Sequence, residues 1–570
     1  MLVPLAVSAV ALVVLVGADY VPTGDHAGTE IAVRALGHHE VLTGLWSRDN
    51  WGHPGPMSFY VFAPFYWLTG GSSVGLSVGA LAVNGASIAA MAVVARRRGG
   101  TALLLCTLVA CALVVRTLGA DIVHDFQNVL IVTLPFGALL FLTWAMTCGE
   151  AWALPAGALC ASFLAQTHVG FLPLALPLLV FGAVWLAVSV LRSDGPDRGG
   201  ERRALRTASL ATGGLLALVW APPVVDVLMH SPNNGRRILE WFKAGDGGVH
   251  GPGDGWAVVT GQFGLPPEWL ISKRPTAWLG ESGFLDDPLL PLLLVPLVAA
   301  AVVLWRRRPD GRSLVAVLAV ALVLAIVAVM RTVGPLFDYR LRWTWMPPLL
   351  AFVLVTWTAW LLAVDRWGRR ADRALTAASL AVLIAVSGMN VVTAATAGTP
   401  HPDDSAMVAA LLPDVLDHLD PDGGAVIVSD PFTSGSWYGR ALALQLERSG
   451  FDVRVPPEKA IEFTAHHGAR PGRVQAHLLV LGDALIDRVG DDSGLRRVAH
   501  SFPERSRVIA RNTRATERIL ADAEDRGMTP AEALADPEIG DAIAAAARPV
   551  PEVEGQTYAL ELAVFIDEDS

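Results

Sequence analysis

The chain has 570 residues, of which 53% are hydrophobic and 17% are charged, and its mean hydropathy is +0.47. This composition excludes an ordinary water-soluble protein and places the chain in a lipid bilayer. The net charge of −10 argues against a nucleic-acid partner, because binding to phosphates requires an excess of Lys and Arg. The four cysteines lie inside apolar runs, a pattern that fits neither a disulfide framework nor a zinc motif.

Long apolar runs predict membrane-spanning helices, since a span needs about 20 apolar residues and must satisfy its own backbone hydrogen bonds. The first run is short and ends in small residues, so a signal peptide is the alternative to a retained helix. No positive charge precedes it, which favours the retained helix. About eleven runs follow one another, at residues 1–17, 73–95, 102–118, 127–147, 151–167, 170–191, 208–226, 288–304, 313–330, 344–364 and 375–397.

Arginine collects in the connections after the second, sixth, eighth and tenth runs. Because positively charged loops stay in the cytoplasm, all four connections are predicted to lie inside. Each follows an even-numbered span, so one threading through the plasma membrane satisfies them all, with the N-terminus inside and the C-terminus outside. The residues concerned are Arg96, Arg97, Arg98, Arg192, Arg198, Arg202, Arg203, Arg206, Arg306, Arg307, Arg308, Arg312, Arg366, Arg369, Arg370 and Arg373.

This threading divides the chain into a transmembrane domain, residues 1–397, and a soluble extracytoplasmic domain, residues 398–570. The outer face then carries the first loop, 18–72, a long loop, 227–287, and shorter loops at 119–126 and 331–343. The soluble domain has 30 acidic and 16 basic residues, a net charge of −14, so the membrane part is near +4.

Within the soluble domain, short apolar runs alternate with helical patterns. We expect strands at 425–429, 452–455 and 477–481, and helices at 435–449, 504–525 and 530–547. This alternation favours a small α/β domain built on a parallel sheet.

The first outer loop carries the carboxylates Asp25 and Glu30 shortly after the first span. A carboxylate at the membrane surface can take a proton from an acceptor hydroxyl that lies within hydrogen-bonding reach. The alternative is that Asp25 caps a helix starting near His26 and that Glu30 is solvated on the face of that helix.

Further along this loop, His53, Pro54, Gly55 and Pro56 form a predicted turn, and an aromatic-rich stretch follows it. The stretch is too short for a span, and the arginine pattern leaves no room for a further crossing. Trp and Tyr rings prefer the membrane interface, so we expect a helix lying in that interface.

These features together resemble the GT-C superfamily of membrane glycosyltransferases, in its actinobacterial type. The family includes protein O-mannosyltransferases, lipid A aminoarabinose transferases and arabinofuranosyltransferases. The resemblance covers residues 1–400 in architecture and residues 19–70 in motifs, where Asp25 matches the first-loop acidic residue and His53 the turn. It implies a polyprenyl-phosphate sugar donor and a carboxylate as general base on the outer face.

Other polar residues are predicted at the outer ends of spans. Asp121, His124 and Asp125 could bind a divalent cation or orient an acceptor, with Asp121 and Asp125 as the metal candidates. His168 and Asp226 could face an outer cavity, since polar groups near lipid are costly unless they are paired. Helix capping and solvation are the alternatives for all five residues.

Three arginines lie in the outer loop 331–343, against the positive-inside bias. Arg is well suited to bidentate phosphate contacts, so Arg340 is the first candidate for the donor phosphate, followed by Arg331 and Arg342. Pairing with Asp338 or with lipid headgroups is the alternative. Outer tryptophans could stack on sugars or anchor the interface: Trp46, Trp51, Trp241, Trp256, Trp269 and Trp278.

The sequence therefore predicts an integral-membrane glycosyltransferase that moves a sugar from a polyprenyl-phosphate donor to an envelope glycan, lipid or protein. The alternatives are a transporter or flippase for an envelope lipid and a non-catalytic interaction protein. Transporters are often built from internal repeats with polar groups near the midplane. Here no repeat is evident and the polar residues gather on one face, which favours the enzyme. A turn at residues 429–436 is a weak candidate for anion binding.

Overall fold

The structure is a computed structural model in which the chain divides into two compact units. Unit 1 comprises Met1–Asp19 and Ala32–Pro400, and unit 2 comprises Tyr20–Ile31 and His401–Ser570. The described residues are 1–17, 19–47, 49–195, 197–244, 249–270, 290–430, 437–489, 494–526, 528, 536, 539, 542 and 561–567. Residues 20–31, which the sequence places in a loop of the membrane domain, thus belong to the unit formed mainly by the C-terminal part.

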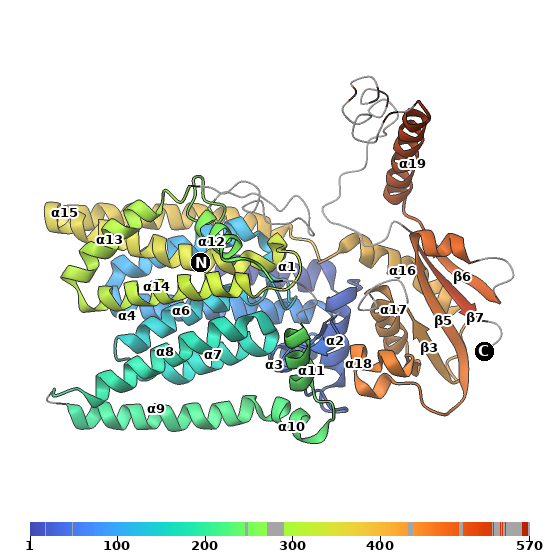
Figure 1. Ribbon diagram of the computed structural model, residues 1–570, viewed down its shortest axis with the longest axis horizontal. Helices are drawn as coiled ribbons and strands as arrows, with labels where there is room; N and C mark the ends of the chain where they lie inside the picture. Colours follow the sequence, from blue (N-terminus) through green and yellow to red (C-terminus); the bar gives the residue numbers. More distant parts are fainter. Residues whose placement is uncertain are drawn as a thin grey trace. The chain divides into compact units, whose positions relative to one another are not determined.

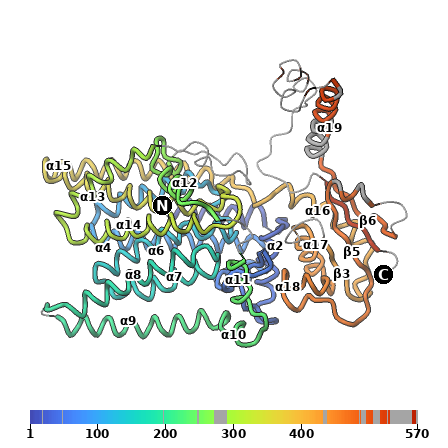
Figure 2. The backbone as a smooth tube through the Cα atoms, in the orientation of Figure 1, coloured from blue at the N-terminus to red at the C-terminus, as the bar shows by residue number. Residues whose placement is uncertain are grey.

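Unit 1 is helical apart from one small hairpin, and its long helices run roughly side by side (Figures 1 and 2). Its elements are α1 (Val3–Ala11), η1 (Leu12–Val16), β1 (Trp46–Ser47), β2 (Trp51–Gly52), α3 (Met57–Leu68), α4 (Val74–Leu118), α5 (Ala120–Val123), α6 (Thr133–Thr147), α7 (Ala153–Thr167), η2 (Val169–Phe171), α8 (Leu172–Leu191), α9 (Arg198–Val219), α10 (Ala221–Met229), α11 (Asn234–Ala244), α12 (Pro252–Gly261), α13 (Leu294–Arg307), α14 (Pro309–Met330), η3 (Asp338–Trp345) and α15 (Met346–Ala395).

Helices occupy each of the eleven expected spans. The second and third lie in α4, which changes direction at Gly100, and the tenth and eleventh lie in α15, which does so at Gly368; both glycines have positive φ. Four helices among the described residues are long and apolar enough to cross a membrane, or five if the bent pair α9 and α10 is one span. Because glycine tolerates a positive φ, Gly100 and Gly368 each let one helix turn directly into the next.

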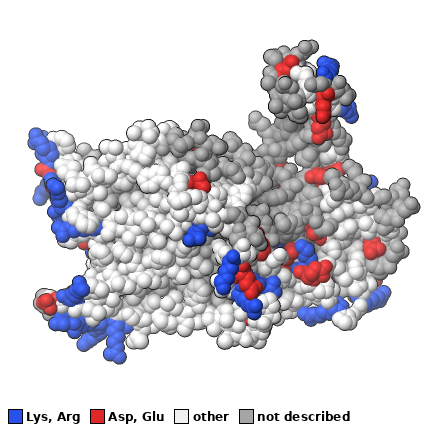
Figure 3. Space-filling model, in the orientation of Figure 1, with Lys and Arg blue, Asp and Glu red and all other residues white. Residues whose placement is uncertain are grey.

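The arginine-bearing connections meet at one end of unit 1. Figure 3 shows Lys and Arg gathered there, at the left edge, while the flank of the helices is almost free of charge. Arg97 contacts Glu150 at 2.7 Å, Arg98 pairs with Glu150 and lies 3.9 Å from Asp310, and Arg307 contacts Asp365 at 2.6 Å. These pairs join connections that the predicted threading puts on the same side.

The core of unit 1 is centred on α6, in which every residue from Thr133 to Thr147 is buried. Aromatic rings pack edge to face around it, with Trp144 between Phe141 and Trp357. The predicted aromatic helix is present as α3, whose Trp67 and Leu68 are exposed at 59% and 83%. An exposed apolar edge of this kind fits the membrane interface.

Unit 2 is an α/β domain with a five-stranded sheet in the order β4-β3-β5-β7-β6. The three expected strands, β4, β3 and β5, are parallel as predicted. The sheet also contains β7 and β6, which were not expected, and β7 is antiparallel to both β5 and β6. The expected helix at 530–547 lies largely outside the described residues. The elements are α16 (Pro402–Leu416), β3 (Ala425–Ser429), α17 (Trp437–Arg448), β4 (Val453–Arg454), η4 (Pro457–Lys459), α18 (Ala460–Phe463), η5 (Ala465–His467), β5 (Val474–Gly482), η6 (Asp483–Arg488), β6 (Leu495–Ser501), α19 (Glu504–Asp525) and β7 (Leu562–Asp567).

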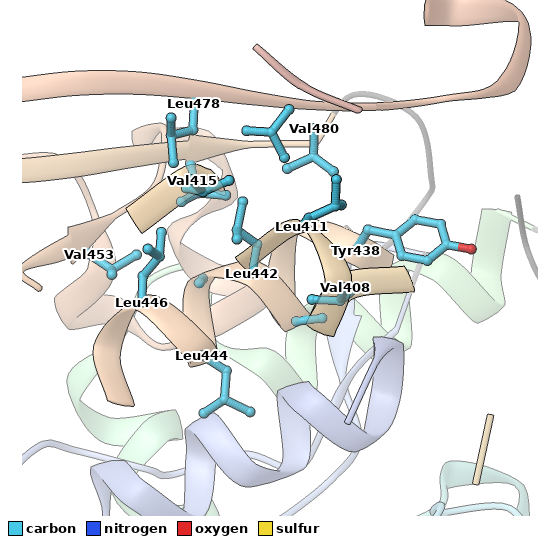
Figure 4. Packing of buried hydrophobic residues seen from close by; sticks show 14 of the residues in the cluster. Val408, Leu411, Val415, Tyr438, Leu442, Leu444, Leu446, Val453, Leu478 and Val480 are labelled. Carbon is cyan, nitrogen blue, oxygen red and sulfur yellow. The ribbon is translucent and has the colours of Figure 1, made fainter. Parts of the chain in front are cut away.

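The core of unit 2 lies between this sheet and the helices α16 and α17. Figure 4 shows Leu411 of α16 and Leu442 of α17 packed with Val480 of β5. Ala27 and Ile31 of α2 (Gly24–Ala35) belong to the same cluster and are 0% and 1% exposed. The first half of α2 is therefore part of this core.

Candidate functional site

Asp25 lies in the first turn of α2, since the helix begins at Gly24, two residues before the start that the capping alternative predicts. Its Oδ1 atom is 3.6 Å from Nη1 of Arg440, a residue of α17. The Arg440 side chain is 1% exposed and that of Asp25 is 32% exposed. Burial lowers the pKa of Arg440, and the nearby Asp25, Glu462 and Asp430 act in the opposite direction. The Asp25 carboxylate is thus fixed by a buried cation and still reaches solvent.

Glu30 lies five residues further along α2 and is fully buried. Its carboxylate forms an ion pair with Arg448 near the C-terminal end of α17. Asp25 and Glu30 are therefore both held by arginines of the same helix, which sequence reasoning missed. Arg440 and Arg448 are eight residues apart, a spacing that puts them on one side of a helix, but nothing local in the sequence connects them to the first loop.

The start of α2 fits tightly against α16 and α17. A Cβ atom on Gly24, which has a φ of +50°, would lie 2.1 Å from the ring of Trp437. Trp437 and Tyr438 donate to the two carboxylate oxygens of Asp404, at 3.1 and 2.8 Å. The position of Asp25 is therefore set by close packing and by buried hydrogen bonds.

In unit 1, His53 follows the β1–β2 hairpin and is 6% exposed. Its Nδ1 atom accepts a hydrogen bond from the backbone N–H of Val169 at 3.2 Å. The turn after it approaches α7 closely, because Gly55 N–H donates to the carbonyl of Gln166 and a Cβ on Gly55 would lie 2.3 Å from the Gln166 side chain. The predicted turn thus places His53 against the start of η2.

His168 lies at the junction of α7 and η2, with its ring centroid 4.7 Å from that of His53. Its Nδ1 atom accepts from the backbone N–H of Gly170 at 3.2 Å. Since Nδ1 is an acceptor in both rings, a neutral imidazole must carry its proton on Nε2. The two side chains therefore each present an Nε2–H donor.

The charge of Arg340, on η3, acts on both imidazoles, and we call His53, His168 and Arg340 the His–Arg cluster. Burial together with the charge of Arg340 lowers the pKa of His53 to about 3. Burial, His53 and Arg340 also hold the pKa of His168 well below its usual value. Arg340 donates to the carbonyls of Val333 and Pro335 at 3.5 and 3.3 Å. The cluster combines one guanidinium with two neutral donors.

Asp226 and Asn234 support this region from α10 and α11. Asp226 is buried and accepts hydrogen bonds from Asn234 N–H at 2.8 Å and from His230 at 3.0 Å. The Asn234 side chain in turn pairs with both backbone groups of Gly52, at 2.7 and 2.8 Å. Asp226 thus positions the segment before His53, a role that depends on Asn234 and that sequence reasoning missed.

The loop carrying Asp121, His124 and Asp125 shows structural contacts. Asp121 is exposed and accepts from Gly398 N–H at 3.1 Å, and Asp125 accepts from Gln127 N–H at 2.7 Å. His124 is fully buried, 3.4 Å from the Ser8 hydroxyl. Among the described residues, these side chains are not part of a group of three or more metal-ligating residues.

The remaining candidates are dispersed. Arg331 is exposed at the end of α14, whereas Arg342 is 5% exposed and stacks over Trp345 at 4.6 Å. Trp278 and most of the turn at 429–436 lie outside the described residues. A small surface hollow in unit 1 is lined by residues of α1, α4, α5 and α15, and none of the predicted site residues line it.

Comparisons with known proteins yield structural likeness only. No family model matches the chain, and neither does any curated protein. Among solved structures, ArnT from Cupriavidus metallidurans bound to undecaprenyl phosphate is 13% identical, with a TM-score of 0.47, over 87% of this chain and 95% of that one. The oligosaccharyltransferase of Archaeoglobus fulgidus is 13% identical, with a TM-score of 0.38, over 78% of this chain and 63% of its own. The function proposed below rests on the residues of this chain.

Proposed function

We propose that this chain is a plasma-membrane glycosyltransferase that moves one sugar from a polyprenyl-phosphate donor to a cell-envelope glycan, lipid or protein. The His–Arg cluster is the observation that carries the proposal. A guanidinium and two Nε2–H donors, grouped at the outer ends of the predicted spans, suit a phosphate that is tethered to a membrane lipid.

The neutrality of the two imidazoles matters for this assignment. With a pKa of about 3, His53 stays uncharged at physiological pH, so it offers a hydrogen bond without a second positive charge. Donors held in place before the reaction stabilise charge as it develops on a leaving group, because they need little reorganisation. The backbone N–H groups of Val169 and Gly170 fix the two rings in this tautomer.

Asp25 is the proposed general base. The side chain of Asp25 reaches solvent, while that of Glu30 is fully buried against Arg448. An acceptor hydroxyl can therefore approach Asp25. We assign Glu30 to the packing of α2.

In the proposed step, Asp25 takes the proton from the acceptor hydroxyl as its oxygen attacks the anomeric carbon of the donor. The bond between that carbon and the phosphate oxygen breaks, and polyprenyl phosphate leaves with the electron pair. One glycosidic bond forms and one sugar–phosphate bond is lost. Arg340, His53 and His168 stabilise the negative charge on the leaving phosphate.

The test follows the release of polyprenyl phosphate by the full-length protein in lipid vesicles, with a panel of polyprenyl-phosphate pentoses and hexoses and an envelope extract as acceptor. Asp25→Asn should lower turnover by about 10²- to 10⁴-fold, the usual contribution of a general base. Asp414→Asn, at an exposed carboxylate of α16, is the matched control and should keep full turnover.

Thermal unfolding of the variants separates a catalytic loss from a folding loss, since Asp25 also neutralises Arg440. A folded Asp25→Asn protein with normal turnover would remove Asp25 as the base. If the wild-type protein moves the donor across the vesicle membrane and releases no polyprenyl phosphate, the flippase alternative replaces the proposal.

A further inference from the structure

Unit 2 contains a group of nitrogen and oxygen ligands that the proposed transfer reaction does not use. Glu447 of α17 and His466 and His467 of η5 each offer one ligand atom, and these atoms all lie within 4.8 Å of one another. The two imidazole centroids are 3.9 Å apart. The side chain of His467 is 1% exposed and that of Glu447 is 18% exposed. One ligand is therefore buried, and the other two are half-buried and open to an entering ion.

Thr464 orients both imidazoles. Its hydroxyl oxygen is 2.8 Å from Nδ1 of His466 and 2.7 Å from Nδ1 of His467. A hydroxyl oxygen has two lone pairs and can accept from both Nδ1–H groups. In that tautomer each ring keeps its Nε2 atom unprotonated. Metal-binding histidines are usually held in this way by a hydrogen bond to the other ring nitrogen.

We propose that Glu447, His466 and His467 bind a divalent transition-metal ion, with Zn²⁺ as the best match. Two imidazoles and a carboxylate form a ligand set that Zn²⁺ accepts, and calcium and magnesium prefer oxygen ligands alone. Three protein ligands leave one position of a tetrahedral site for water.

The contact between His467 and Glu447 already brings two of the three ligand atoms together. The Nε2 atom of His467 lies 2.5 Å from Oε1 of Glu447. A metal ion between them would take the place of this direct contact, with both ligands in their deprotonated forms. With metal–ligand bonds of about 2.0–2.2 Å, two tetrahedral ligands lie about 3.3 Å apart, and this pair must separate by roughly 0.8 Å.

The ion would connect α17 to the segment 457–468. That segment is tied to β4, because Val455 N–H donates to the carbonyl of His467 at 2.8 Å. Zinc bound here therefore cross-links a core helix to the edge of the sheet. Since an ion that binds only the folded form adds its binding free energy to stability, zinc should raise the unfolding temperature of unit 2.

The experiment measures Zn²⁺ bound to the full-length protein in detergent, purified without a polyhistidine tag, by elemental analysis and by competition with a chromophoric chelator. We expect one tightly bound zinc per chain. His466→Gln and Glu447→Gln should each weaken binding at least 100-fold. Thr464→Val keeps all three ligands and should weaken it about 10- to 100-fold, as removal of an outer-shell partner does.

His418→Gln, at an exposed histidine after α16, is the matched control and should bind zinc like the wild type. Circular dichroism without metal confirms that each variant is folded, and Co²⁺ in place of Zn²⁺ reports nitrogen ligation through its visible spectrum. The proposal is overturned if the wild type binds no stoichiometric zinc, or if folded His466→Gln and Glu447→Gln bind it as tightly as His418→Gln. Both outcomes leave the transfer reaction untouched, because turnover is measured separately.

Discussion

Buried charge is arranged differently in the two units. In unit 2 it occurs as opposite pairs from distant parts of the sequence, with Glu30 against Arg448 and Asp25 against Arg440. In unit 1 the His–Arg cluster gathers groups that all donate hydrogen bonds. Paired charges compensate one another and fix the fold, whereas donors of one kind held together suit an anionic ligand. The ion pairs thus help to hold unit 2 together, and under the proposed function the donor phosphate binds at the His–Arg cluster of unit 1.

The variant Arg340→Gln is the strongest test of whether the donors of unit 1 serve the reaction. If Arg340 stabilises the leaving phosphate, this variant should lower turnover by about 10²- to 10³-fold, the usual loss when one donor to a developing anion is removed. Its unfolding temperature should stay close to that of the wild type. Steady-state kinetics with the donor panel measure the effect, and Arg236→Gln, at an arginine 63% exposed on α11, is the control. Full turnover in Arg340→Gln would mean that unit 1 holds the phosphate elsewhere.

For Glu30→Gln we expect a loss of stability, in contrast to the loss of turnover in Arg340→Gln, because the substitution removes the carboxylate that pairs with Arg448. The free energy of unfolding should fall by about 2–3 kcal/mol, below the largest values for buried pairs because Arg448 is 20% exposed. Denaturant unfolding followed by Trp fluorescence measures it. Glu458→Gln, at an exposed carboxylate of η4, should change stability by less than about 0.5 kcal/mol. An unchanged stability in Glu30→Gln would show that the pair is not what anchors α2.

The dependence of stability on pH tests the protonation state of His53 in unit 1. His53 has a pKa of about 3 in the folded protein against 6.5 in a model peptide, so the unfolded chain binds a proton first as the pH falls. The stabilisation is therefore complete above pH 6.5 and is lost progressively between pH 6.5 and 3, by up to about 1.4 kcal/mol per pH unit. As the pH is lowered from 6.5 to 3, the unfolding temperature should fall less steeply for His53→Gln than for His418→Gln. Equal slopes in the two variants would mean that His53 is protonated in the folded protein.

Local patterns in the sequence predicted local structure well. The β-branched run at 425–429 forms β3 with the same limits, and the aromatic stretch after Pro56 forms α3. The antiparallel strands β6 and β7 were missed. The two arginines in the middle of β6 hide its alternation, and β7 comes near the end of the sequence, more than 70 residues after its partner β5.

The site was predicted as single residues and not as an arrangement. His53 was a candidate through its turn, which resembles that of the family, and Arg340 as an arginine in an outer loop that suits a phosphate. His168 was a candidate as a polar group at the end of a span, where such groups are costly unless paired. Their grouping depends on contacts between residues more than 100 positions apart, as between His53 and Val169. The partners of Asp25 and Glu30 are more than 400 positions away, and a single sequence contains no signal for such pairs.

The membership of residues 20–31 in unit 2 sets the order in which the protein can assemble during translation. This segment leaves the ribosome some 380 residues before its partners in α16, and α17 follows later still. Ala27 and Ile31 therefore lack their final neighbours until α16 and α17 have been synthesised. A fragment starting at residue 398 would lack one piece of its own core, so the C-terminal domain should be expressed together with residues 20–31 if it is to fold apart from the membrane.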